Sequence, residues 1–173
     1  VDEDDLGAIS IGSDTEPQTL LNTDFTETNL ALSPDGNWLA YQSDESGTNQ
    51  VFVRPFPDVE SGLWQVSRSG GQWPEWGPDG DELFYVSTSG EFIATRVQTE
   101  PTFSVGTEEG LFDADQFYFG PRDGYAVSPN GDRFLMLRTG GLSGDPEDIG
   151  PDRSQLNVVQ DWYQELEQRV PVP

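Results

Sequence analysis

The sequence predicts an all-β fold, a β-propeller of about three and a half four-stranded blades within one domain over residues 1–173. Three observations predict it. One turn motif occurs three times along the chain, its copies are about one blade apart, and each copy lies between two short apolar segments. A recurrence of about 40 to 50 residues is typical of propeller blades and other repeat arrays.

The repeated motif is a tight turn within a predicted hairpin. It reads Ser-Pro-Asp-Gly at residues 33–36, Gly-Pro-Asp-Gly at residues 77–80 and Ser-Pro-Asn-Gly at residues 128–131. Proline sets φ at about −65°, and glycine accepts the positive φ that closes the turn. Ser33 and Gly77 are 44 positions apart (77 − 33), and Gly77 and Ser128 are 51 apart (128 − 77). This spacing fits one blade with a connecting loop of variable length.

Further strand candidates complete two blades. After the first hairpin, residues 50–54 and 63–67 have the composition of strands, and residues 92–97 and 109–112 do so after the second hairpin. We therefore predict one blade over residues 24–69 and another over residues 70–116, each with its first strand nearest the propeller axis.

The two ends of the chain predict incomplete blades. Residues 8–11 and 18–21 are expected to be the last two strands of a partial blade over residues 6–23. A partial blade over residues 117–160 is expected to begin with an aromatic loop at residues 117–119 and to contain a strand at residues 156–159. A short C-terminal helix is expected over residues 161–170, because Pro171 would stop it.

A β-sandwich is the alternative fold, since it also consists of short strands separated by turns. The repeated hairpin favours the propeller. A sandwich does not require one motif to recur at blade spacing, whereas a propeller places the same strand at the same position in every blade.

The charge of the chain restricts its partners. There are 32 acidic residues and eight basic ones, all of them arginine, so the formal net charge is −24. Such a charge repels phosphate backbones and anionic lipid surfaces, which argues against nucleic-acid binding and membrane docking. We favour a solvated acidic surface over a dedicated cation-binding face. The lack of lysine also resembles proteins of halophilic organisms.

The side chains that most enzymes depend on are missing from this sequence. Histidine, cysteine and lysine do not occur, which removes Ser-His-Asp catalysis and metal sites built from histidine or cysteine. We predict no enzymatic activity, no cofactor and no metal site. A cation held by the acidic loops at residues 113–115 and 145–148 remains an open alternative. Paired carboxylates remain, so a carbohydrate-active enzyme with Glu75 as its first carboxylate is the alternative function.

Candidate ligand-binding residues lie where the first strands of the blades begin, because these positions surround the mouth of the central channel. They are Asn29, Trp73, Glu75 and Tyr125. Trp76 lies in register with the repeat and is expected in the core. For Trp73, packing between blades and a binding platform both remain open.

The hairpins and their surroundings resemble TolB-type, WD-like propeller repeats of bacteria. The similarity is carried by residues 29–47, 53–57 and 64–67 and by the closing residues 156–166. It extends to the C-terminal propeller half of bacterial receptor-type serine/threonine kinases. The resemblance implies half of a six-bladed ring, a periplasmic or extracytoplasmic location, and a protein-interaction or ligand-sensing role as the sensor part of a larger protein. No kinase motif occurs in these residues.

The expected partner is a protein or a peptide. A half-ring would expose sheet edges at residues 8–11 and 156–159, and such edges need a cover. We predict a homodimer in which two copies complete one ring. If the sequence is a fragment of a longer chain, the remaining half would cover the same surfaces. No segment is long and apolar enough for membrane insertion.

Overall fold

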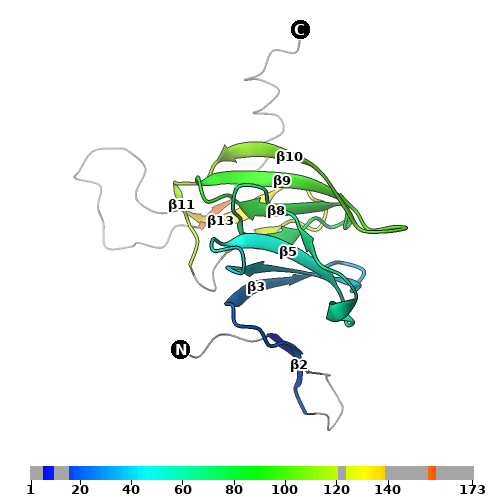
Figure 1. Cartoon of the computed structure of the whole chain (residues 1–173). Helices are drawn as coiled ribbons and strands as arrows, with labels where there is room; N and C mark the ends of the chain where they lie inside the picture. The colour runs from blue at the N-terminus through cyan, green and yellow to red at the C-terminus, as the bar shows by residue number, and fades with distance from the viewer. Residues whose placement is uncertain (1–5, 10–15, 121–123, 139–155, 159–173) are drawn as a thin grey trace, which may run out of the picture.

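The computed structural model describes residues 6–9, 16–120, 124–138 and 156–158, and within them the protein is built from antiparallel β-sheets (Figure 1). A short hairpin comes first and consists of β1 (Leu6–Ala8) and β2 (Gln18–Leu21). The next sheet consists of β3 (Glu27–Leu32), β4 (Trp38–Ser43), β5 (Gln50–Pro55) and β6 (Trp64–Gln65). A single 3-10 turn, Val59–Ser61, connects β5 to β6.

Two more four-stranded sheets follow along the chain. The first consists of β7 (Gln72–Trp76), β8 (Glu82–Val86), β9 (Glu91–Gln98) and β10 (Ser104–Asp113). The second consists of β11 (Phe117–Tyr118), β12 (Tyr125–Val127), β13 (Phe134–Arg138) and β14 (Leu156–Val158). In this last sheet β13 is central and pairs with β11, β12 and β14.

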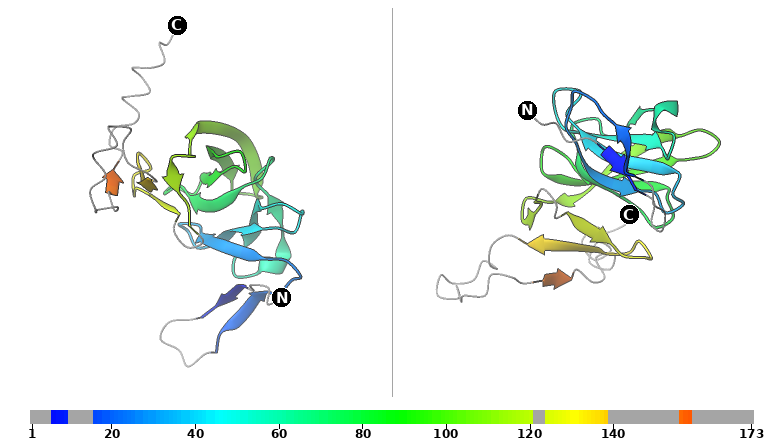
Figure 2. Two further views of the ribbon diagram at one scale, coloured as in Figure 1. Left: turned by 90° about the vertical axis from the view of Figure 1, so that its left-hand side faces the viewer. Right: turned by 90° about the horizontal axis from the view of Figure 1, so that it is seen from below.

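The sheets follow one another along an arc, with the β1–β2 hairpin at one end and β13 at the other (Figure 2). Strand β7 contacts β3 and β4 of the preceding sheet and β12 of the following one, so edge strands of successive sheets are neighbours. Antiparallel four-stranded sheets that follow one another in this way are the blades of a β-propeller. The predicted fold class is therefore confirmed.

The predicted turns close the hairpins in the expected conformation. Their glycines share one position and have φ values of 75°, 73° and 72° at Gly36, Gly80 and Gly131. In the first turn the Ser33 hydroxyl accepts a hydrogen bond from the Trp38 backbone N–H at 2.9 Å. The Ser128 hydroxyl does the same for Arg133 at 3.0 Å. The backbone N–H groups of Ser33, Gly77 and Ser128 also each donate to the carbonyl five residues later, so the three copies of the motif share one set of backbone bonds.

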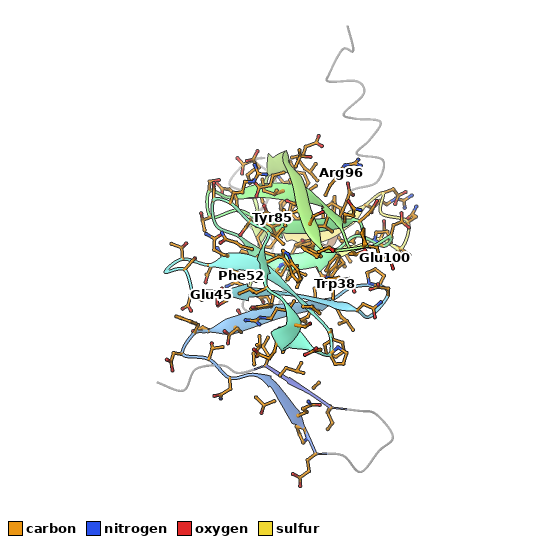
Figure 3. All side chains as sticks on the ribbon, turned by 45° about the vertical axis from the view of Figure 1, so that its right-hand side comes forward. Trp38, Glu45, Phe52, Tyr85, Arg96 and Glu100 are labelled. Carbon is orange, nitrogen blue, oxygen red and sulfur yellow. The ribbon has the colours of Figure 1, made fainter. Side chains whose placement is uncertain are left out.

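The core lies between the sheets rather than within any one of them. Trp76 is only 6% exposed, and its Nε1–H donates to the Ala31 carbonyl at 3.1 Å, which joins β7 to β3 of the preceding blade. Trp38 and Tyr85, labelled in Figure 3, belong to the same apolar layer, whereas Glu100 is exposed. The predicted core position of Trp76 is confirmed.

Three predicted elements differ from the structure or lie outside it. Residues 117 and 118, expected in a loop, form β11, because their backbone pairs with β13 and Phe117 packs against the neighbouring aromatic cluster. The first strand is Leu6–Ala8 rather than residues 8–11, since Leu6 is the residue that is buried. The helix expected over residues 161–170 lies outside the described residues.

Candidate functional site

The first strands of two successive blades carry the same irregularity. In β3, Asn29 and Leu30 lie between the paired residues Thr28 and Ala31, and the register of β3 on β4 shifts there. In β7, Trp73 and Pro74 lie at the corresponding place, where the register of β7 on β8 shifts. These are β-bulges, which bend a strand and redirect its side chains and which are frequent next to functional sites.

The bulges have a strained backbone. Asn29 has φ of 53° and Trp73 has φ of 54°, in the left-handed region that side-chain-bearing residues seldom adopt. Asparagine tolerates this conformation, but for tryptophan the cost is on the order of 1–3 kcal/mol. Strain of this kind persists where the surroundings impose it, and it is concentrated at ligand-binding sites. The bulges therefore mark a candidate site.

Between the bulges is a pocket of about 420 Å³, which we call the bulge pocket. It is lined by Asn29, Leu30, Trp73, Pro74, Glu75, Gly124 and Tyr125. All four residues predicted from the sequence line this one pocket, although whether they bind a ligand stays a prediction. Leu30, Pro74 and Gly124 were not predicted. The repeat itself indicates them. Asn29, Trp73 and Gly124 each lie four positions before the turn (33 − 29, 77 − 73 and 128 − 124), and Leu30 and Pro74 are the residues that follow Asn29 and Trp73.

Glu75 supplies the carboxylate of the bulge pocket. Burial raises the pKa of this carboxyl above its ordinary value, because an ionised group is less well solvated there than in water. Its carboxylate makes no hydrogen bond and no ion pair with any residue in the described part of the chain. The site therefore holds a partly desolvated acid without a described partner.

Tyr125 forms the wall next to Glu75. The residue is 8% exposed, and its hydroxyl is buried without a hydrogen-bond partner among the described residues. Burial, and secondly the negative charge of Glu75, raise the pKa of this hydroxyl well above its usual range. A buried hydroxyl without a partner costs free energy, and such groups in native proteins call for a specific explanation.

The other two predicted residues are held in place by neighbours. The Asn29 side-chain Nδ2 donates to Gln42 Oε1 at 2.9 Å, which leaves the amide oxygen of Asn29 as an acceptor. The Trp73 ring stacks on Phe119 with centroids 5.0 Å apart, and its Nε1–H donates to the Gly120 carbonyl at 3.0 Å. Trp73 thus takes part in packing between blades and also lines the pocket.

A second pocket of about 450 Å³, which we call the loop pocket, shares Trp73 with the bulge pocket. It is lined by Gln72, Trp73, Val86, Ser87, Thr88, Ser89, Gly90, Ala114, Asp115, Phe117 and Phe119. Its serine hydroxyls, Ser87 and Ser89, bond to each other at 2.8 Å. The Asp113 carboxylate accepts a hydrogen bond from the Asp115 backbone N–H at 2.9 Å, as expected for a turn. Among its described lining residues the loop pocket has no buried hydroxyl without a partner, such as that of Tyr125 in the bulge pocket.

Acidic side chains do not gather into a metal site within the described ranges, where no group of three or more could hold a metal ion. Residues 113–115, named above as an open cation site, form the turn just described. Residues 145–148 lie outside the described part of the chain.

Replacing Glu75 should stabilise the protein at neutral pH. The raised pKa means that the ionised carboxylate is disfavoured in the folded state, which lowers the free energy of unfolding. This loss of stability is fully present above the folded pKa, and it is relieved as the pH falls towards the ordinary value of 4.5. We expect Glu75→Gln to raise the unfolding temperature at pH 7 by roughly 1–2 °C more than Glu109→Gln, since partial solvent exposure limits the penalty.

Glu109 is an exposed glutamate in β10, so its substitution removes the same charge without relieving any burial. Thermal unfolding at pH 7 and at pH 5 measures both variants. The excess gain of Glu75→Gln should shrink at pH 5. Equal gains for the two variants at both pH values would show that the Glu75 carboxylate is not penalised by burial.

Two solved structures share the fold of this chain. One, a TolB candidate from Agrobacterium tumefaciens, is 18% identical, with a TM-score of 0.50 over 69% of this chain and 40% of its own. The other, an oligogalacturonate lyase from Vibrio parahaemolyticus, is 14% identical, with a TM-score of 0.53 over 79% of this chain and 36% of its own. The chain therefore spans about two fifths of the length of these structures. At this identity the similarity shows a TolB-like β-propeller fold.

The other comparisons add no family. No protein-family model matches the sequence, and no curated protein is similar to it. Within the described ranges, no helix is both long enough and apolar enough to cross a membrane.

Proposed function

We propose that this chain is a non-catalytic β-propeller module that binds a protein or peptide at the bulge pocket. The observation that carries the proposal is the position of Glu75 next to Tyr125 in the lining of the pocket. A partly desolvated carboxylate lies next to a buried hydroxyl, and neither has a hydrogen-bond partner among the described residues. A ligand bound in the pocket would supply a hydrogen-bond partner for the Glu75 carboxylate, and protein partners commonly bury a charged or aromatic side chain at the centre of an interface.

The composition of the site supports binding over catalysis. Glu75 is the one carboxylate among the described residues that line the pocket. Glycoside hydrolysis by paired carboxylates requires a second one about 5 to 10 Å away. The sequence has no histidine, cysteine or lysine to take its place as a base or nucleophile.

A carbohydrate-active enzyme is the second candidate function. It is favoured by the shared fold with the oligogalacturonate lyase and by the raised pKa of Glu75. Incubation of the protein with oligogalacturonate and with neutral polysaccharides measures this enzymatic activity directly. Turnover that is lost in Glu75→Gln and kept in Glu109→Gln would replace the binding proposal with the enzymatic one.

The binding proposal is tested by selecting peptides from a random display library on the immobilised protein. Enriched peptides should bind the wild type and lose at least tenfold in affinity on Gly124→Leu. A Cβ at Gly124 would lie 3.9 Å from the Trp73 Cβ, so leucine adds bulk on the pocket wall. Gly7→Leu, at an exposed position of β1, is the matched control and should bind normally. Enriched peptides that bind Gly124→Leu as tightly as the wild type would contradict the proposal.

The setting that we propose is the sensor part of a larger bacterial protein, such as a receptor-type kinase, with the propeller outside the cytoplasm. Its support is the resemblance of the repeats and the span of about two fifths of the solved propellers. A cationic segment on the partner would suit the acidic surface of this chain.

A homodimer that completes the ring is the assembly that we propose. Leu32 is 48% exposed on the face of β3 that points towards the β1–β2 hairpin, which lies at one end of the arc. Leu135 and Leu137 are each 41% exposed at the other end, on the face of β13 opposite the buried Phe134 and Met136. Two copies related by a two-fold axis would cover both faces at once.

Light scattering tests the assembly. We expect a mass of about 38 kDa (2 × 19.1) for the wild type and dissociation in Leu135→Glu, because a buried charge opposes apolar contact. A monodisperse species near 19 kDa that stays unchanged on concentration would exclude the dimer.

A further inference from the structure

The bulge pocket presents acceptor oxygens to a ligand. One N–H of the Asn29 Nδ2 is bonded to Gln42, and the amide oxygen of Asn29 remains for a ligand. Glu75 carries only acceptor oxygens when ionised. The one indole N–H in the lining, that of Trp73, is occupied by the Gly120 carbonyl. A ligand that brings N–H donors therefore fits these acceptors.

The charge of the pocket points to a cation. The described arginines that form ion pairs, Arg68, Arg96 and Arg133, pair with acids elsewhere, and none of them lines the pocket. The acid of the pocket is thus without a described counter-ion on a chain of net charge −24. A cationic ligand would restore the free energy lost by desolvating Glu75, and the field of the whole protein would attract it.

The shape of the pocket distinguishes between cations. Its acceptors come from two different strands, with Asn29 on β3 and Glu75 on β7, and the aromatic residue Trp73 lines the same pocket. A guanidinium is planar, presents several N–H donors in different directions and stacks on aromatic rings, whereas an ammonium is a compact, strongly hydrated charge.

We propose that the bulge pocket recognises a guanidinium group, the arginine side chain of the bound partner, with Glu75 as its ion-pair partner. This inference rests on the proposed function and specifies its ligand. Asn29 accepts an N–H from the same group, Trp73 provides the aromatic surface, and Tyr125 closes the wall behind Glu75.

The test compares two probes of nearly the same shape, of which only one is charged and which differ at one terminal group, an NH2 in one and an oxygen in the other. Nα-acetyl-arginine amide carries the guanidinium, and Nα-acetyl-citrulline amide replaces it with a neutral urea of the same shape. Each is titrated into the full chain at low salt, and binding is followed by NMR at the Trp73 indole N–H and at backbone amides. We expect the arginine probe to bind at least tenfold more tightly, in the range of charge-assisted hydrogen bonds.

Variants assign the charge effect to Glu75. Glu75→Gln should weaken binding of the arginine probe to the level of the citrulline probe, and Glu109→Gln should change it less than twofold. Asn29→Ala should weaken binding of both probes by a similar factor, since it removes a neutral acceptor. Affinity of the arginine probe should also fall with salt, as expected for an ion pair that remains accessible to solvent.

The outcomes separate this inference from the proposed function. Equal affinities for the two probes, with binding lost in Gly124→Leu, would overturn the guanidinium assignment and leave the bulge pocket as the binding site. Binding of the arginine probe that is insensitive to both Glu75→Gln and Gly124→Leu would overturn the assignment and place the ligand elsewhere. Failure of both probes to bind would also overturn the assignment, while the peptides enriched by display would still report on the pocket.

Discussion

Phe92→Ala should lower the free energy of unfolding by about 3–5 kcal/mol. Phe92 lies in β9 with no exposed surface, at the centre of the aromatic cluster between two blades. Its ring is 4.8 Å from that of Phe112 in its own sheet, and 4.7 Å and 4.8 Å from those of Tyr125 and Phe134 in the next sheet. The substitution would leave a cavity at the interface of the two blades.

Denaturant unfolding measures this loss, and Phe25→Ala serves as its control. Phe25 is 40% exposed, so we expect its truncation to cost less than about 1 kcal/mol. A loss for Phe92→Ala no greater than for Phe25→Ala would mean that the two sheets do not pack through this cluster. Because Tyr125 rests on Phe92, the substitution should also weaken ligand binding at the bulge pocket.

Salt should stabilise the protein strongly. With a net charge of −24 and eight arginines, repulsion between acidic side chains opposes the compact state. The ion pairs of the described residues do little against it: the distances are 3.8 Å for Arg68–Glu108, 3.9 Å for Arg96–Glu82 and 3.6 Å for Arg133–Asp132, and each arginine is substantially exposed. We expect the unfolding temperature to rise by roughly 10 °C or more between low and molar salt, as the Debye length falls to about 3 Å.

Thermal unfolding in NaCl and in KCl at equal ionic strength checks the salt effect. Screening predicts the same rise in both salts, with most of it below about 0.5 M because the Debye length changes most there. An unfolding temperature that does not depend on salt would show that the acidic side chains are spaced too widely to repel one another appreciably.

The sequence predicted the fold because its signals were local and repeated. Proline and glycine define each turn within four residues, and Ser33 and Ser128 make the same hydrogen bond in their hairpins. The burial of Trp76 followed from its place in the repeat. Strand β11 was missed because it has two residues and owes its existence to pairing with β13, which is distant in sequence.

The candidate site was only partly predictable for a related reason. The repeat located Asn29, Trp73, Glu75 and Tyr125 at the starts of the first strands, and these residues do line one pocket. The positive φ of Trp73 and the shifts of register cannot be recognised from the alternation of apolar residues in the sequence. Nor could the sequence show that the Tyr125 hydroxyl is buried without a described partner, which depends on how blades pack.

The central claim, that the bulge pocket is the binding site, is tested most directly by hydrogen–deuterium exchange of the full chain with and without a peptide selected on it. Bound peptide should slow exchange at the amides of residues 29–31, 73, 75–76 and 124–127, which carry the pocket and its flanking strands. Residues 87–90 and 114–119, which line the loop pocket, should be unaffected apart from the neighbourhood of Trp73. Protection confined to residues 87–90 and 114–119, with none at the bulges, would contradict the account.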